Sequence, residues 1–155
     1  MAGFGLSDDT SARAVGLARG APIGALFLRI ILVAYWLAHW WVKVEFRGMP
    51  ATEMFFISLG LPGWLAWFDI SIEIVFAVLF LAGAFYRIAC IASLPILVAS
   101  IVIYGHNGFY FPTGGIELPL LWGLVQIAAC LIGPGSLSVQ VALTRRKDLV
   151  GWLSL

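Results

Sequence analysis

Four apolar runs, each close to the length of a membrane-spanning helix, are separated by short stretches of polar residues, glycine and proline. A spanning helix needs about 20 mainly apolar residues. The pattern therefore predicts four transmembrane helices, over residues 23–42, 64–84, 88–104 and 116–133. Pro22 suits the first turn of the first helix, and Pro95 should kink the third. Gly133 and Pro134 should end the fourth.

The segments between and around these runs complete the predicted architecture. Residues 1–21 show no sustained periodicity and predict a flexible tail. Pro50, Gly60 and Pro62 are start and stop signals for a helix too short to span, which we expect to be interfacial. The three-residue turn 85–87 forces an antiparallel hairpin. The expected fold is an all-α membrane protein, an antiparallel bundle of four transmembrane helices over residues 22–138, followed by a basic tail at 139–155.

Composition supports this class. The chain is 62% hydrophobic and 11% charged, with mean hydropathy +1.01, whereas a soluble domain carries about a quarter charged residues. The net charge of +1 argues against binding to nucleic acid. Cys90 and Cys130 form no C-x-x-C pair, so a thioredoxin-like or zinc-ribbon site is not predicted, and small buried hydrophobic residues are the better interpretation. The sequence therefore indicates an integral membrane protein.

The distribution of lysine and arginine predicts how the bundle is oriented. With four spans, both tails and the 85–87 turn lie on one side, and the opposite side holds only Lys43 and Arg47. Loops on the cytoplasmic side carry the excess of basic residues. We therefore expect both termini in the cytoplasm, on the side that holds Arg13, Arg19, Arg87, Arg145, Arg146 and Lys147.

Ionisable residues inside the predicted spans mark inward-facing helix faces. Seven-residue steps place Arg29, Trp36 and Lys43 on nearly one stripe of the first helix. The spacing of four puts Asp69 and Glu73 on one face of the second, which must turn away from lipid. Arg29, Asp69 and Arg87 are assigned structural roles. An ion pair with Arg29 or a hydrogen bond to a polar side chain remains as open for Glu73 as proton handling.

A cluster of candidate site residues should converge in the outer half of the bundle. The stretch from residue 106 to 122 holds one of the two histidines, an asparagine, a glutamate and several aromatic residues between two apolar runs. Aromatic walls with a few polar groups suit a flat quinone, whose carbonyls need donors, or a lipid head. Alternatively, these residues are interface anchors. No metal-ligand spacing is present. The candidates are Trp36, His39, Trp40, Glu73, His106, Asn107, Phe109, Glu117 and Trp122.

Several short pieces of the chain, taken in order over about residues 22–140, resemble the DoxX family of small four-helix bacterial membrane proteins. The pieces are Leu28-Arg29, Ala38-His39, Phe56-Ile-Ser-Leu-Gly-Leu-Pro62, Glu73, Phe85-Tyr-Arg87, His106-Asn-Gly-Phe109, Gly115-Ile-Glu117 and Gly133-Pro-Gly-Ser-Leu-Ser138. The resemblance implies a bacterial inner-membrane location. The family is named after a subunit of a thiosulfate:quinone oxidoreductase, which implies a link to redox assemblies but transfers no catalytic residue.

These observations lead to one expected function and two alternatives. We expect a membrane subunit of a larger, redox-linked assembly that contacts lipid and other subunits and holds a quinone or lipid head in its outer half. The sequence has no haem-ligand spacing, flavin motif or dinucleotide motif, so no covalently bound cofactor is expected. In the first alternative, the subunit itself takes part in electron or proton transfer with quinone. A small transporter is less favoured because no inverted repeat is visible.

Overall fold

The computed structural model describes the backbone of residues 6–145 and the side chains of residues 20–144, and this part of the chain is helical without strands. Four helices form the body of the protein, and two shorter ones lie at its ends. A π-helical turn, η1, continues α1 over Val42–Phe46, and 3₁₀ turns follow α4 at Gly105–Asn107 and Phe111–Thr113. The α-helices are α1 (Leu6–Trp41), α2 (Met49–Ser58), α3 (Leu65–Ala82), α4 (Tyr86–Tyr104), α5 (Glu117–Ile132) and α6 (Val139–Arg145).

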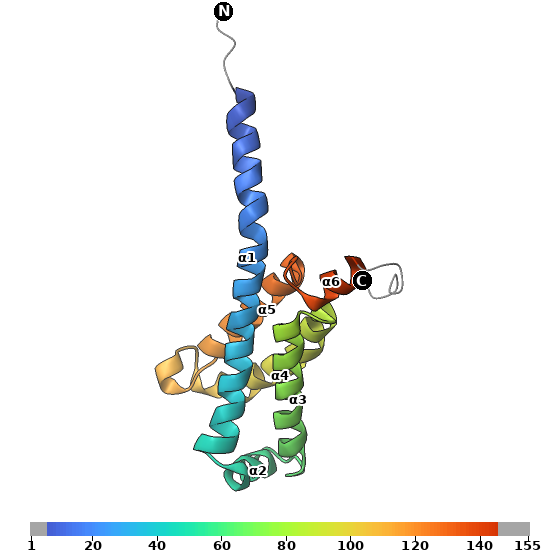
Figure 1. Ribbon diagram of the computed structural model, residues 1–155. Coiled ribbons are helices and arrows are strands. Elements are labelled where there is room, and N and C mark those ends of the chain that lie inside the picture. The colour runs from blue at the N-terminus through green and yellow to red at the C-terminus, as the bar shows by residue number, and fades with distance from the viewer. Residues whose placement is uncertain (1–5, 146–155) are drawn as a thin grey trace, which may run out of the picture.

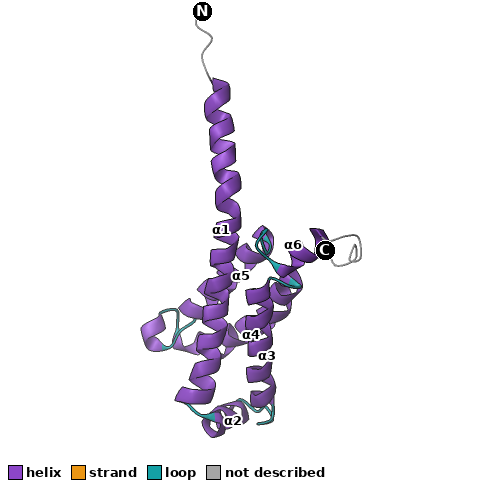
Figure 2. Ribbon diagram, in the orientation of Figure 1, coloured by secondary structure: helices purple, strands orange, loops and turns teal. Residues whose placement is uncertain are grey.

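The helices are arranged as two packed pairs. α1 lies along α3, and α4 lies along α5 behind them (Figure 1). The helix α2 crosses one end of this body, which we call the α2 end, while α6 lies at the other, the α6 end. In Figure 2 the loops next to α2 and α6 lie at these two ends, the loop between α4 and α5 stands out to one side, and α1 projects beyond the α6 end. Polar side chains that lie at the same height along the bundle on different helices can therefore meet inside the body.

The described helices identify a membrane protein. Three stretches are long and apolar enough to cross a membrane: Gly20–Phe46, Leu65–Ala82 and Tyr86–Asn107. The fourth, α5, is apolar but has 16 residues, about 24 Å of helix against a hydrocarbon core of about 30 Å. All four predicted apolar helices are present, but a complete crossing by α5, and with it the four-span bundle, stays a prediction.

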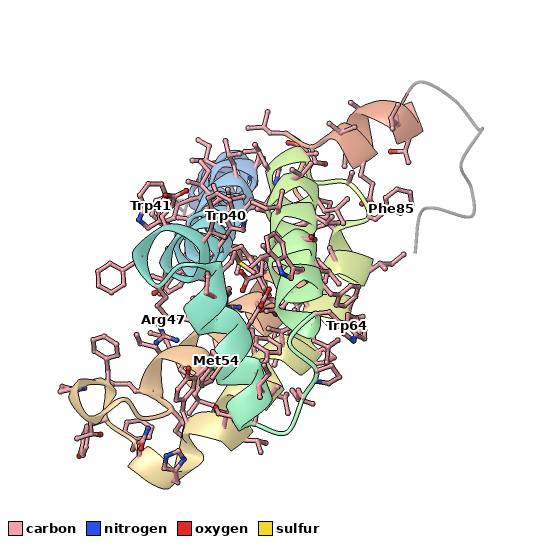
Figure 3. The ribbon with its side chains drawn as sticks, turned by 90° about the horizontal axis from the view of Figure 1, so that it is seen from below. Trp40, Trp41, Arg47, Met54, Trp64 and Phe85 are labelled. Carbon is pink, nitrogen blue, oxygen red and sulfur yellow. The ribbon has the colours of Figure 1, made fainter. Side chains whose placement is uncertain are left out.

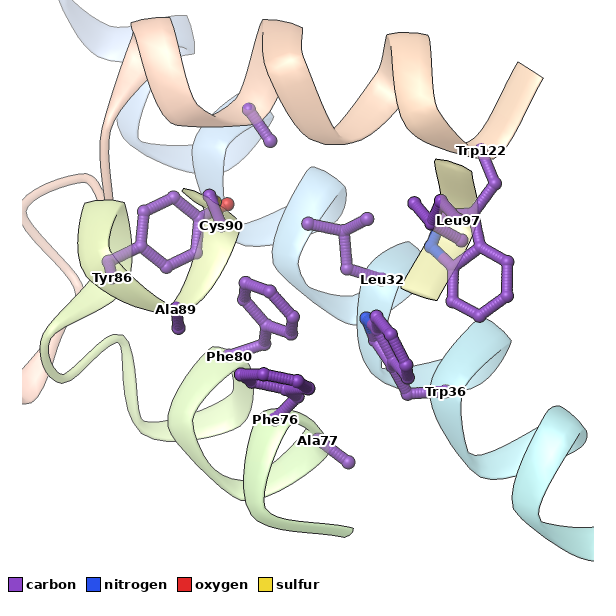
Figure 4. Close-up of a cluster of buried hydrophobic side chains, with 11 residues drawn as sticks. Leu32, Trp36, Phe76, Ala77, Phe80, Tyr86, Ala89, Cys90, Leu97 and Trp122 are labelled. Atoms are coloured by element: carbon purple, nitrogen blue, oxygen red, sulfur yellow. The ribbon is translucent and has the colours of Figure 1, made fainter. Parts of the chain in front are cut away.

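Large apolar side chains cover the outside of the helices, as expected for a surface in contact with lipid. Seen from the α2 end, Trp41 and Trp64 point outward on opposite sides of the α1–α3 pair, and Met54 and Phe85 are also outward (Figure 3). The interior is built instead from aromatic residues stacked between the helices. Trp36, Phe76 and Phe80 belong to this core, with Tyr86 and Trp122 beside them (Figure 4).

The start of α1 differs from the predicted flexible tail. The helix begins at Leu6 and runs through Pro22 without ending, so the structure of this segment was predicted wrongly. Alanine, leucine and arginine, which favour helices, make up half of residues 6–21. Proline inside a helix removes a single hydrogen bond and need not end it. Most of the predicted basic tail, residues 146–155, lies outside the described residues.

The predicted short helix in the first loop is present as α2. It begins at Met49, with Pro50 in its first turn, and ends at Ser58. Its position at the lipid–water interface stays a prediction. On its buried side, Thr52 donates a hydrogen bond from Oγ1 to the Lys43 carbonyl oxygen at 2.9 Å, which fixes α2 against the end of α1.

Arg29 is buried at the α6 end, where it holds three segments together. Its Nε donates to the Phe80 carbonyl oxygen at 2.9 Å and its Nη2 to that of Leu81. Its Nη1 donates to the carbonyl oxygens of Leu137, at 2.8 Å, and Pro134, at 3.3 Å. Arg29 is therefore a helix-pairing residue. The alternative of an Arg29–Glu73 ion pair is wrong, because all of these hydrogen bonds go to backbone carbonyls.

Candidate functional site

An ion-paired cluster joins α1 to α3 near the α2 end. The ammonium Nζ of Lys43 donates to Glu73 Oε1 at 2.7 Å and to a carboxylate oxygen of Asp69. The spacing of four residues in α3 brings both carboxylates to the same face, one turn apart. The Glu73 side chain is 1% exposed, whereas those of Lys43 and Asp69 are 19% and 15% exposed. We call these three residues the Lys43 cluster.

The charges of the Lys43 cluster do not balance. One ammonium faces two carboxylates, so the three groups carry a net charge of −1 when all are ionised. Isolated charge buried in an apolar environment is costly, and taking up one proton makes the cluster neutral. The cluster can therefore bind and release one proton while its three side chains stay at the helix interface.

His39 lies directly beside this cluster. Its Nδ1 is 4.0 Å from Glu73 Oε1, and its ring packs against the indole of Trp122 with 4.9 Å between ring centroids. The His39 side chain is still 49% exposed. His39, near the end of α1, precedes Lys43 in η1 by four residues, a helical spacing that places the two on one face. His39 therefore connects the outer surface of the bundle to a buried, protonatable cluster.

Two buried tryptophans form the floor beneath His39. The ring centroids of Trp36 and Trp122 are 4.7 Å apart, and Trp36 also packs on Phe76 at 5.3 Å (Figure 4). Among the described residues, neither indole N–H has a hydrogen-bond partner, and the same holds for Glu73 Oε2. A buried polar group without a partner costs about 1–3 kcal/mol. Three such groups next to one half-exposed histidine are a reason to expect a polar ligand or water here.

The other predicted site residues lie apart from this cluster. His106 is exposed, with Nδ1 2.8 Å from the Ile103 carbonyl oxygen in its own turn. Asn107 Nδ2 donates to the Gly114 carbonyl oxygen at 3.1 Å, and Glu117 accepts from the Phe111 N–H at 2.9 Å. These contacts hold the 105–116 loop in shape.

Two aromatic candidates are likewise outside the cluster. Phe109 is exposed in the 105–116 loop and packs on Tyr110. Trp40 is partly buried, and at about 100° per residue it lies about 100° from His39 around α1, on the other side of Trp36. The structure thus brings together Trp36, His39, Glu73 and Trp122, and places the remaining five predicted residues elsewhere.

Lys43 is the residue that the sequence analysis did not include in the site. It was placed on one stripe with Arg29 and Trp36, and all three side chains indeed turn inward. Asp69, assigned a structural role, joins it. Arg87, by contrast, is exposed, with its guanidinium beside Gly133. A signal for Lys43 was available, because a cation on an inward stripe opposite two carboxylates is expected to pair with them.

Comparison with known proteins identifies the family. The DoxX family model matches residues 24–106. The chain belongs to the DoxX family. A relative from Bacillus subtilis (strain 168), named "Putative oxidoreductase CatD", is 35% identical over 118 residues, which cover 76% of this chain and 85% of the relative. No solved structure matches the chain. The DoxX match covers α3, α4 and the part of α1 from residue 24 onward, and so His39 and the whole Lys43 cluster, but not Trp122 on α5.

Proposed function

We propose that this DoxX protein is the membrane subunit of a redox-linked assembly, and that it binds the head of a quinone against His39. The observation that carries the proposal is the position of His39. Half of its side chain is exposed, and the other half contacts Glu73 and Trp122. A quinone dissolved in the bilayer can approach the exposed half from the side. Imidazole can then donate a hydrogen bond to a quinone carbonyl.

The surroundings of His39 suit a quinone in shape and polarity. The aromatic rings of Trp36 and Trp122 provide flat apolar surface, and their indole N–H groups are donors without partners among the described residues. Quinone carbonyl oxygens are acceptors only. A site of apolar walls with a few convergent donors is what such a ligand requires.

The Lys43 cluster supplies the proton chemistry that quinone reduction needs. A quinone becomes a hydroquinone by taking up two electrons and two protons. Glu73 and Lys43 lie in line behind His39, and Asp69 and Lys43 are partly exposed toward the α2 end. In this proposal protons pass from that end through the cluster to His39. The electrons come from a redox protein bound to the same assembly.

The comparisons support a redox-linked role. The relative from Bacillus subtilis bears a name that describes an oxidoreductase, and the residues of the Lys43 cluster fall within the family match. The sequence itself has no recognisable motif for haem, flavin or dinucleotide, so electron delivery is assigned to a partner rather than to this chain.

The two histidines provide a matched pair for the test. In His39→Ala, quinone binding should weaken by up to about tenfold, because one net hydrogen bond of about 0.5–1.5 kcal/mol is lost. His106→Ala should bind as wild type, since His106 contacts its own helix turn. Binding is measured by quenching of tryptophan fluorescence as a short-chain ubiquinone is added to purified protein. Equal binding by wild type and a folded His39→Ala variant would contradict the site.

The assembly is tested separately. Mild solubilisation of native membranes, followed by purification through a tag on this chain, should yield a redox protein in fixed ratio. A chain that is recovered alone, with quinone bound, would leave the His39 site in place but remove the assembly from the proposal.

A further inference from the structure

The two cysteines of the chain meet between α4 and α5, near the α6 end. Two contacts set the register of these helices. Gln126 Nε2 donates to the Cys90 carbonyl oxygen at 2.9 Å, and Cys130 Sγ lies 4.0 Å from the Arg87 carbonyl oxygen. Gln126 and Cys130 are one turn apart on α5, as Arg87 and Cys90 nearly are on α4. This register places Cys90 and Cys130 next to each other across the contact between α4 and α5.

The environments of the two thiols differ. Cys90 is buried in the core, at 1% exposure, while Cys130 is only partly covered. The hydroxyl of Tyr86 points toward Cys90 (Figure 4). Tyr86 is fully buried, and its hydroxyl has no hydrogen-bond partner among the described residues. A buried donor beside the Cys90 thiol is more than apolar packing requires, because a side chain without the hydroxyl would fill the same space.

We infer that Cys90 and Cys130 are a redox-active thiol pair that a membrane quinone oxidises to a disulfide. In this step both S–H bonds break and one S–S bond forms. The two electrons and two protons pass to the two oxygens of the quinone, which leaves as hydroquinone. Cys130 is the thiol that the quinone meets, since it is partly exposed on the surface of α5, and Cys90 completes the disulfide from inside. A dithiol reductant reverses the reaction.

This site goes beyond the proposed function and is independent of His39. Cys130 follows Trp122 by about two turns of α5, or about 12 Å. A quinone head held against His39 and Trp122 therefore cannot touch the thiols, and the oxidising quinone binds at a second place. The spacing of the cysteines in the sequence shows no pair; only the packing of α4 on α5 creates one.

The test counts thiols in the folded wild-type protein. The protein is reduced, freed of reductant, and incubated with excess ubiquinone-1, whose ring has no open position for covalent attachment. It is then denatured in acid and treated with a maleimide polymer that shifts the gel band once per free thiol. We expect both shifts to disappear and to return after dithiothreitol. Hydroquinone should form in one equivalent per chain, measured by absorbance.

Variants locate the reaction. Cys90→Ala and Cys130→Ala should each retain one reactive thiol as a monomer and should form no hydroquinone above background. His39→Ala should oxidise as fully as wild type, which separates this site from the proposed quinone site. Two free thiols in folded wild type after incubation, or the same hydroquinone yield from the single-alanine variants, would overturn the inference. Loss of thiol oxidation in folded His39→Ala would overturn its independence.

Discussion

Lys43 Nζ lies between two carboxylates that both come from α3, so one cation of η1 is the counter-ion of two acids. Removing one partner of a buried ion pair typically costs about 3–5 kcal/mol, because the remaining charge stays buried without compensation. The burial of Glu73 makes it the more sensitive of the two acids. The carboxylate of Asp69 is closer to the surface and can be solvated by water.

Substitutions of Glu73 should distinguish the contribution of its charge to folding stability from that of its shape. Glu73→Gln should fold nearly as stably as wild type, because its carbonyl oxygen still accepts from Lys43 and Asp69 remains as the counter-ion. Glu73→Lys should fail to fold or lose several kcal/mol, since a second ammonium is then buried and two ammonium groups share the one carboxylate of Asp69. Unfolding in detergent, followed by circular dichroism as sodium dodecyl sulfate is added, measures both. A lysine variant as stable as wild type would show that Glu73 does not depend on Lys43.

Residue positions on helices could be predicted from the sequence, and positions in loops could not. The stripe of Arg29, Trp36 and Lys43 and the inward face of Glu73 follow from helical periodicity, and the structure confirms them. His106 and Glu117 were expected to join His39. They do not, because the 105–116 loop satisfies its polar groups internally. Local hydrogen bonds of this kind carry no periodic signal.

At the scale of the elements, Arg29 stabilises the C-terminal end of α3. The last carbonyls of a helix have no partners inside it, and a cation there also complements the helix dipole. Arg29 supplies both functions from α1 through Phe80 and Leu81, and it binds the segment before α6 through Leu137. Three parts of the chain thereby depend on one close approach, at Gly83.

Gly83→Ala tests that approach. Gly83 has φ +62, and a Cβ there would lie 2.6 Å from Ser138 Cβ and 2.9 Å from Arg29 Cζ. We expect a loss of about 1–3 kcal/mol in the free energy of unfolding from overpacking and the left-handed backbone. Gly24→Ala is the control, because nothing lies within 4 Å of its Cβ position. It should be neutral or raise stability by up to about 1 kcal/mol. Both free energies of unfolding are measured by chemical denaturation. Similar changes in the two variants would contradict the close approach at Gly83.

The apolar runs predicted the cores of α1, α3, α4 and α5, and proline and glycine signals predicted α2. The sequence was less informative where a helical segment contains no apolar run. The first residues of α1 are helical from Leu6 although the apolar run begins after Pro22, and the alanine, leucine and arginine residues there favour a helix by propensity. Likewise, the pairing of α1 with α3 and of α4 with α5 depends on side-chain packing, which periodicity alone does not specify.

For the molecule as a whole, contacts at the α6 end show that the chain returns after α5. Arg29 on α1 reaches the carbonyl of Leu137, and the Cβ of Ser138 lies beside Gly83 at the end of α3. Residues 134–138 are therefore level with the turn between α3 and α4. The 105–116 loop follows the opposite end of α4. This arrangement favours a chain that crosses the bilayer a fourth time with α5, despite the short length of that helix.

Thiol labelling can decide this topology. In a background of Cys90→Ala and Cys130→Ala, a cysteine at Thr113 should react with an impermeant maleimide in intact cells, and one at Thr144 should react only after lysis. Both positions are exposed in the structure, so access depends on the side of the membrane. The expectation follows from four crossings and from the excess of basic residues on the side of the termini. Labelling of both in intact cells would mean that α5 does not cross. Labelling of Thr144→Cys alone would mean that the bundle is inverted, with the Lys43 cluster then opening toward the cytoplasm.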